Sequence, residues 1–226
     1  MRKRIISSLL LTAAVTATAT AAPRAQGLYG TIKLFDVDRQ LSDMTLTSPR
    51  VTHRTQDPKS TRSLNGSLGL GYQYQSPLRI ELEYTLPSDA RYVGRWAPFT
   101  ANDNVLYTRT QRLMLNGYAS WPLTRNLSLY GMLGAGVAVT TASGWQTRPE
   151  RAFESHRNLR AAYAAGIGAD LRIAEGMHLE LGYRHVDLGR ISTNPNLFDN
   201  RAHARDEQLK GHLREHNVYL GFRKML

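Results

Sequence analysis

The sequence contains no cysteine, and beyond its N-terminal segment it contains no long apolar run. The lack of cysteine excludes a disulfide framework and a thiolate metal site, although it does not exclude an oxidising compartment. No stretch approaches the roughly 18 consecutive apolar residues of a transmembrane helix. A helical membrane protein is therefore excluded, but a transmembrane β-barrel is not, because its apolar residues alternate with polar ones.

The N-terminal segment has the order of a secretory signal peptide. A basic head, Met1–Arg4, precedes a short apolar run over residues 5–15, and small residues follow. The run is too short and too rich in Thr and Ala to form a good membrane span. We expect a signal peptide over residues 1–21 that is cleaved after Ala21, with Ala25 as the alternative position.

The chain is basic, with a formal net charge of +11 that falls to +8 once the head of the signal peptide is removed. A basic exported protein suits anionic partners such as nucleic acid, anionic glycans or lipid phosphates. The basic residues are spread along the chain and form no run interleaved with aromatic residues. This pattern argues against a nucleic-acid partner.

The clearest periodic stretch is residues 159–188. In steps of two from Leu159 to Ile173, one face is wholly apolar and the other is small or charged. A tight turn follows, and from Met177 onward the alternation resumes in a return strand. A period of two places successive side chains on opposite faces of a strand, so this stretch predicts a two-faced antiparallel hairpin.

The same alternation predicts six further strands, which brings the total to eight. They cover residues 28–35, 64–75, 78–86, 112–121, 127–139 and 217–226. The connections alternate strictly between long segments (36–62, 87–109, 141–157 and 189–213) and short ones (76–77, 122–126 and 174–176). Bacterial outer-membrane barrels combine an even strand count with short periplasmic turns and long outer loops, whereas a sandwich has no reason to gather its long loops at one end.

We therefore predict that residues 22–226 form one all-β domain, an eight-stranded antiparallel up-and-down transmembrane barrel with three short periplasmic turns and four long outer loops. Its apolar faces would meet lipid and its polar faces would line the lumen. The lumen set is Lys33, Arg79, Glu81, Glu83, Arg112, Asp170, Arg172, Glu180, Arg184 and Arg223. Eight strands enclose a space that side chains can fill, and buried opposite charges should pair. We expect a salt-bridged plug, with a narrow ion path as the alternative, and we expect the lumen glycines to leave room for large neighbours.

Two patterns carry possible chemistry. His212–His216 reads His-x-x-Glu-His, an inverted zinc-peptidase pattern. It lies where a loop becomes a strand, and an extended backbone would separate the histidines, so we interpret it as a coincidental surface cluster. His185 and Asp187 share a strand face, and an outer-membrane lipid-modifying enzyme would need a serine such as Ser192 beside them. Nothing in the sequence fixes that geometry, and we expect no cofactor and no metal.

The predicted long loops are rich in basic residues. They carry Arg50, Arg54, Lys59, Arg62, Arg91, Arg95, Arg148, Arg151, Arg157, Arg190, Arg201, Arg205 and Lys210. We expect Arg91, Arg95, Arg148, Arg151, Arg157, Arg205 and Lys210 to contact lipopolysaccharide phosphates through charge-assisted hydrogen bonds. The alternative is an ordinary solvated charged surface.

Four segments resemble a known family. Leu179–Gly189 (LELGYRHVDLG) resembles the penultimate-strand signature of small outer-membrane barrels of the opacity-protein and surface-antigen type, a porin-like family. Leu133–Ala138 and Ala165–Asp170 resemble the preceding strands, and Asn217–Arg223 resembles the final strand. Such chains usually end in phenylalanine, whereas this one ends in leucine.

The resemblance implies a protein of the bacterial outer membrane that acts through its outer loops. We expect a non-enzymatic surface antigen, adhesin or envelope-stabilising protein, whose partners are outer-membrane lipid, lipopolysaccharide and a host or envelope ligand. The alternatives are a small passive channel and an outer-membrane lipid-modifying enzyme.

Overall fold

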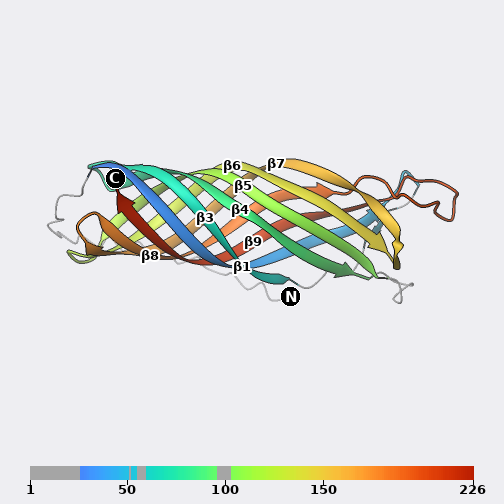
Figure 1. Ribbon diagram of the computed structural model, residues 1–226, viewed down its shortest axis with the longest axis horizontal. Helices are drawn as coiled ribbons and strands as arrows, with labels where there is room; N and C mark the ends of the chain where they lie inside the picture. The colour runs from blue at the N-terminus through green and yellow to red at the C-terminus, as the bar shows by residue number, and fades with distance from the viewer. Residues whose placement is uncertain (1–25, 51, 55–59, 96–102) are drawn as a thin grey trace, which may run out of the picture.

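The computed structural model describes residues 26–50, 52–54, 60–95 and 103–226, so the expected signal peptide lies outside the described residues. All of its regular elements are β-strands (Figure 1). They are β1 (Gly27–Thr47), β2 (Thr52–Arg54), β3 (Thr61–Gln73), β4 (Leu78–Gly94), β5 (Asn104–Pro122), β6 (Leu127–Gln146), β7 (Arg148–Ala174), β8 (Met177–Ser192) and β9 (Gln208–Met225). Within the described ranges, no helix is long and apolar enough to cross a bilayer.

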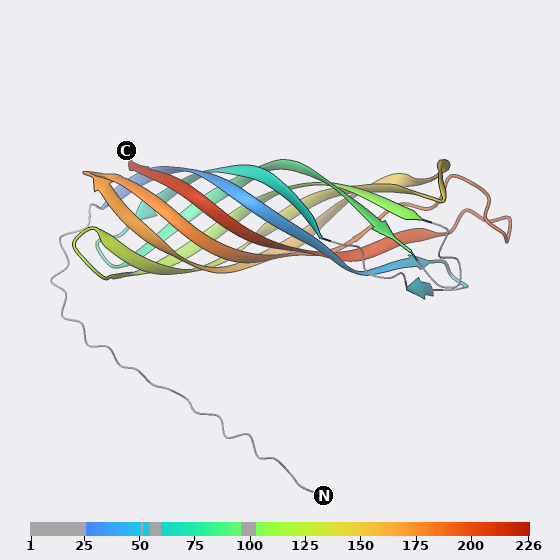
Figure 2. The same cartoon turned by 90° about the horizontal axis from the view of Figure 1, so that it is seen from below.

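The strands form one closed ring. Each long strand pairs antiparallel with the next one along the chain, and β1 also pairs with β9, from Tyr29 opposite Met225 to Thr47 opposite Gln208. The short strand β2 adds only to the outer end of β1. Figures 1 and 2 show the strands winding obliquely around the long axis of the molecule. Leaving the short β2 aside, the predicted eight-stranded up-and-down barrel is confirmed.

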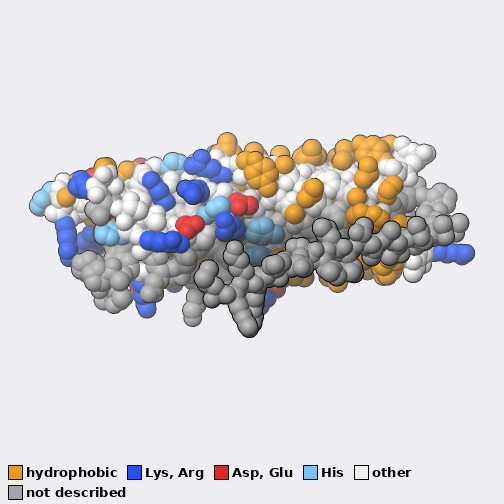
Figure 3. Space-filling model, turned by 180° about the vertical axis from the view of Figure 1, so that it is seen from behind, with side chains coloured by type: hydrophobic (Ala, Val, Ile, Leu, Met, Phe, Trp, Pro, Cys, Tyr) orange, Lys and Arg blue, Asp and Glu red, His pale blue; other side chains and the backbone are white. Residues whose placement is uncertain are grey.

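An apolar belt surrounds the half of the barrel that carries the short turns. Its side chains point outward and are exposed; among them are Leu28, Ile32, Leu34, Leu68, Leu70, Ile80, Leu82, Leu115, Leu133, Tyr163, Ile167, Leu181, Leu220 and Phe222. On the face shown in Figure 3, hydrophobic side chains gather over one half of the length and charged groups gather over the other. Such a belt would be unfavourable in water and matches the lipid-facing band of a membrane barrel.

The strands continue well beyond this belt, and there the polar side chains face outward and the apolar side chains face inward. On β1, outward Leu34 is followed by outward Asp36 and Gln40, while inward Lys33 is followed by inward Val37 and Leu41. The other strands behave alike, and their inward apolar residues form a second, interior core. Its members include Val37, Leu41, Leu46, Tyr92, Leu106, Ala142, Leu188, Ile191, Leu209 and Leu213. Above the belt, the barrel is therefore polar outside and apolar inside, as in a water-soluble barrel.

This reversal shortens the predicted loops. The predicted loops include residues that belong to strands, namely 36–47, 52–54, 61–62, 87–94, 104–109, 141–146, 148–157, 189–192 and 208–213. Between β6 and β7 only Thr147 remains, in a left-handed conformation with φ 67°. The prediction failed here because polar residues face outward in both loops and water-exposed strands. Pro87 also marked a loop start, yet β4 passes through it at a register shift between Thr85 and Ser88, the kind of bulge where a strand tolerates proline.

Two glycines give a matched test of this packing. A Cβ on Gly136 would collide with the Leu113 carbonyl oxygen and lie 2.7 Å from the Cα of Met114, whereas a Cβ on lipid-facing Gly117 would have its nearest neighbour 3.9 Å away. We expect Gly136→Ala to destabilise the barrel by about 1–3 kcal/mol through overpacking, and Gly117→Ala to leave stability unchanged. Urea titration of the folded band on unboiled gels measures both. Equal midpoints for the two variants would contradict the close approach of β5 and β6.

Candidate functional site

The lumen at the level of the belt is filled by a buried ion-pair network. At its centre, Glu83 accepts hydrogen bonds from Lys33 at 2.8 Å and from Arg184 at 2.7 Å. Lys33 also pairs with Glu81 and donates to the Tyr118 hydroxyl at 2.9 Å. These ionic side chains are almost completely shielded from solvent. A buried charge is costly unless it is paired, and here every charge has at least one opposite partner.

A second cluster lies toward the short turns. Arg79 donates to Glu180 at 2.6 Å and to Asp170 at 3.3 Å. Arg223 donates to the same two carboxylates, at 2.9 Å in the case of Glu180. His178 then meets Asp170 with a distance of 2.6 Å between Nδ1 and Oδ1. Two acids therefore face two arginines, with one imidazole at the solvent side of the cluster.

A third cluster closes the network at the upper edge of the belt. Glu215 accepts from Arg39 at 2.7 Å and pairs with Arg112, and Arg39 also donates to the Ser88 hydroxyl at 2.6 Å. Neither Arg39 nor Glu215 belongs to the predicted lumen set, because Arg39 falls in a predicted loop and Glu215 precedes the predicted last strand, in a pattern interpreted as a surface cluster. The strict inward parity of β1 and β9 is the signal that would have found them.

Aromatic rings complete the filling of the lumen. The Arg79 guanidinium lies 4.1 Å from the ring centroid of Tyr118. The hydroxyls of Tyr130 and Tyr219 are 2.7 Å apart. A Cβ on Gly182 would lie 2.5 Å from the Tyr219 ring and 2.7 Å from the Tyr130 hydroxyl oxygen, so this glycine makes room for both rings, as expected for the lumen glycines.

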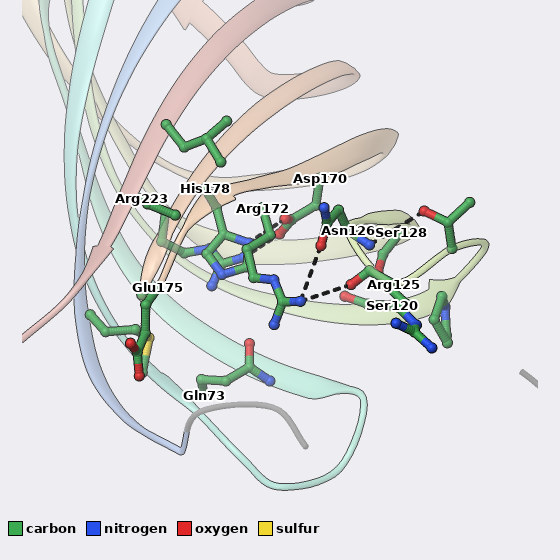
Figure 4. Close-up of a pocket in the computed structure, with 16 residues that line it drawn as sticks. Gln73, Ser120, Arg125, Asn126, Ser128, Asp170, Arg172, Glu175, His178 and Arg223 are labelled. Atoms are coloured by element: carbon green, nitrogen blue, oxygen red, sulfur yellow. Dashed lines mark hydrogen bonds and ion pairs between the residues drawn. The ribbon is translucent and has the colours of Figure 1, made fainter. Parts of the chain in front are cut away.

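Nine of the ten residues assigned to the lumen are buried in these clusters, and Arg172 is the exception. Arg172 lies at the mouth near the short turns, where it donates to the Arg125 carbonyl at 3.2 Å and to Asn126 Oδ1 at 3.0 Å. It lines a cavity of about 730 Å³ (Figure 4). Arg172 lies on the same strand face as Asp170 but one step closer to the short turns, which takes it out of the buried network.

The His212–His216 pattern and the His185/Asp187 pair lie on neighbouring strands, β9 and β8. Residues His212 and His216 point outward from β9 while Glu215 points into the lumen, so the zinc-peptidase geometry is not formed. His212 Nε2 contacts Asp187 at 2.7 Å, and the rings of His185 and His216 are 4.8 Å apart. In the described part of the chain, no group of three or more His, Asp or Glu side chains is placed to hold a metal.

Electrostatics in this outer cluster follow its contacts. Partial burial raises the pKa of the Asp187 carboxyl, but hydrogen bonds from His212 and from the Gly189 N–H outweigh burial and lower it below its usual range. Burial, with His216 alongside, lowers the pKa of His185. Asp187 is thus paired with His212 rather than with His185, and the dyad expected of a lipid-modifying enzyme is not assembled.

The basic residues of the outer end differ in their partners. Arg95 pairs with Asp103 at 2.7 Å, Arg205 with Asp199 at 2.9 Å, and Arg148 with Glu150 at 3.9 Å. Arg151 donates to Gln146 and stacks on Phe198, and Arg91 hydrogen-bonds Tyr107, which lowers the pKa of that phenol. Arg157 and Lys210 are exposed and make no ion pair with any described residue. Lys59 lies outside the described residues.

A closed, belted barrel with a paired-charge lumen is a transmembrane β-barrel of the outer-membrane type. The sequence profile of the outer membrane protein beta-barrel domain matches residues 6–222, and the chain belongs to this family. The protein is accordingly a bacterial outer-membrane protein. It is 24% identical over 166 residues to outer membrane protein PagN of Salmonella typhimurium. The aligned segment covers 67% of this chain and 69% of PagN.

Solved structures share the fold. The crystal structure of OprG from Pseudomonas aeruginosa matches with a TM-score of 0.53 and 15% identity, over 91% of this chain and 99% of OprG. The outer membrane protease OmpT from Escherichia coli matches with a TM-score of 0.53 and 8% identity, over 93% of this chain and all of OmpT. At these identities the similarity establishes architecture alone.

The ion-pair network predicts that the Glu83 carboxylate makes a large contribution to folding stability. Glu83→Gln would leave the guanidinium of Arg184 buried without its acid partner, so we expect a loss of about 3–5 kcal/mol of folding free energy. Glu150→Gln, which removes an exposed acid 3.9 Å from Arg148, should change stability by less than about 0.5 kcal/mol. Urea-induced unfolding of the protein in lipid vesicles compares the two variants. A Glu83→Gln midpoint equal to that of Glu150→Gln would show that the network is not stabilising.

Proposed function

We propose that this protein is a non-enzymatic surface protein of the outer membrane, which binds an anionic ligand through the part of the barrel that rises above the belt. The carrying observation is the reversed alternation of the outer section. Its strands hold an apolar core inside and direct mostly polar side chains, such as Asp36, Gln40 and Arg109, into water. A rigid, water-exposed extension of this kind serves presentation of a surface, since the membrane itself needs only the belted section.

The ligand chemistry follows from the unpaired cations. Arg157 and Lys210 are exposed, and neither makes an ion pair with a described residue. Arg157 also borders a shallow hollow of about 320 Å³ on the outer wall, together with Arg109 and Thr141. Phosphates of lipopolysaccharide and acidic groups of host or envelope glycans are the anions that this surface meets. Among the seven cations proposed to contact lipopolysaccharide, Arg157 and Lys210 are the strongest candidates, because no described carboxylate pairs with either of them.

A passive channel has less support. A pore would have to pass the ion-pair network at belt level and then the apolar core formed by residues such as Leu41, Leu106 and Leu213. An enzyme also has less support, because Asp187 is engaged by His212, and among the described residues no serine hydroxyl is hydrogen-bonded to the imidazole of that pair. An adhesin, antigen or envelope-stabilising role requires neither an open path nor a reactive group.

The binding proposal is tested on whole bacteria. Cells of a non-adherent strain that display the protein should adhere to a surface coated with a sulfated or phosphorylated glycan, and added salt should reduce the adhesion. The double variant Arg157→Gln/Lys210→Gln should reduce adhesion about three- to tenfold. The matched control is Arg50→Gln/Arg62→Gln, two arginines outside the seven proposed cations that pair with Asp206 and Asp36, and this variant should adhere as the wild type does. Adhesion equal to that of cells without the protein would refute the proposal.

The filled lumen generates a separate prediction about conductance. Purified protein reconstituted in a planar bilayer should give no stable single-channel steps, because a hydrated ion cannot pass the packed side chains without displacing them. Reproducible unitary steps that change in size in the Glu83→Gln variant would establish the channel alternative instead.

A further inference from the structure

The mouth of the barrel near the short turns contains the cavity of about 730 Å³ noted above. Figure 4 shows its lining residues converging from several strands on one open space. This end of an outer-membrane barrel faces the periplasm. The volume lies within the range of pockets that hold small molecules or fragments of polymers.

The cavity exists because the last inward layer of the barrel is built from short or neutral side chains. Gln73, Ser120 and Ser128 line it from β3, β5 and β6. Its floor is the buried cluster of Asp170 and Arg223 described above, with His178 beside it. The walls therefore offer hydroxyl and amide groups, and the floor is already neutralised by internal pairing.

The charge left over in the cavity is positive. Asp170 and Glu180 are balanced by Arg79 and Arg223, whereas Arg172 hydrogen-bonds only to two neutral oxygens. Arg125 also lines the cavity, and neither Arg125 nor Arg172 forms an ion pair within the described residues. Glu175 is the acid at the rim, and no described cation pairs with it.

We propose that this cavity binds a carboxylate-bearing fragment of the cell wall, with the Arg172 guanidinium as the carboxylate anchor. Both existing bonds are made by Nη2 of Arg172, to the Arg125 carbonyl and to Asn126 Oδ1, and they hold the guanidinium in place. Its Nη1 and Nε make no hydrogen bond with a described residue and can donate charge-assisted hydrogen bonds to a carboxylate. The serine, asparagine and glutamine side chains suit the hydroxyl and amide groups of a peptidoglycan sugar or stem peptide. The site would tie the barrel to the periplasmic polymer beneath it.

Calorimetry on the mature full-length protein in detergent tests this site, with a soluble disaccharide-tetrapeptide from peptidoglycan as the probe. We expect wild-type protein to bind the probe and Arg172→Gln to weaken binding at least about tenfold, the effect of losing a charge-assisted pair. The control is Arg148→Gln, an exposed arginine at the opposite end, which should bind as the wild type does. Gel mobility without boiling verifies that each variant is folded.

Three outcomes would overturn the proposal: binding that Arg172→Gln leaves unchanged, equal affinity for neutral chitobiose, and binding of free peptides with a C-terminal carboxylate in place of the cell-wall fragment. The last would instead assign the site to a periplasmic protein. The adhesion test uses substitutions at the opposite end of the barrel, so either result can fail without the other.

Discussion

Hydrocarbon provides no hydrogen-bond partners, and this constraint fixes the main features of the structure. Each backbone N–H and C=O within a bilayer must find its partner inside the protein, since an unpaired group costs several kcal/mol. The pairing of β1 with β9 meets this demand, because it joins the first long strand to the last and leaves the belted section no free edge. Closure removes the free edge, and the surrounding lipid accounts for the inward placement of the polar side chains.

The belted section is surrounded by lipid and the outer section by water, and the two sections place apolar and polar side chains on opposite faces of the strands. In the belted section, leucines and isoleucines face lipid, and Glu83, Lys33 and Arg184 form buried ion pairs across the lumen. In the outer section, Asp36 and His212 face water and Leu41 and Leu213 pack inside. The same strands run through both sections. The boundary between lipid and water is therefore marked on each strand by the point where the apolar face changes from the outward side to the inward side.

That boundary also explains how far the sequence could predict the structure. Strict alternation located every strand inside the belt, and the inward parity of Lys33, Arg79 and Glu180 was readable from residue type alone. The outer halves of the strands were missed because a polar outward residue looks the same in a loop and in a water-exposed strand.

Long-range pairing was also out of reach. Glu215 joins Arg39 across 176 residues, and no local pattern marks such a partner. The peripheral position of Arg172 was equally hidden, because it depends on how far the lumen remains filled toward the short turns.

The single-residue connection at Thr147 has a consequence for biogenesis. β6 and β7 are 20 and 27 residues long, so their hairpin reaches far past the belt, and its tip carries Arg148, Glu150 and Arg151. If strands enter the bilayer from the periplasmic side, those charged side chains must cross its hydrocarbon core before the apolar core of the outer section can pack. Moving charged groups through hydrocarbon costs free energy, so the charges at the tip add to the barrier that this hairpin must cross.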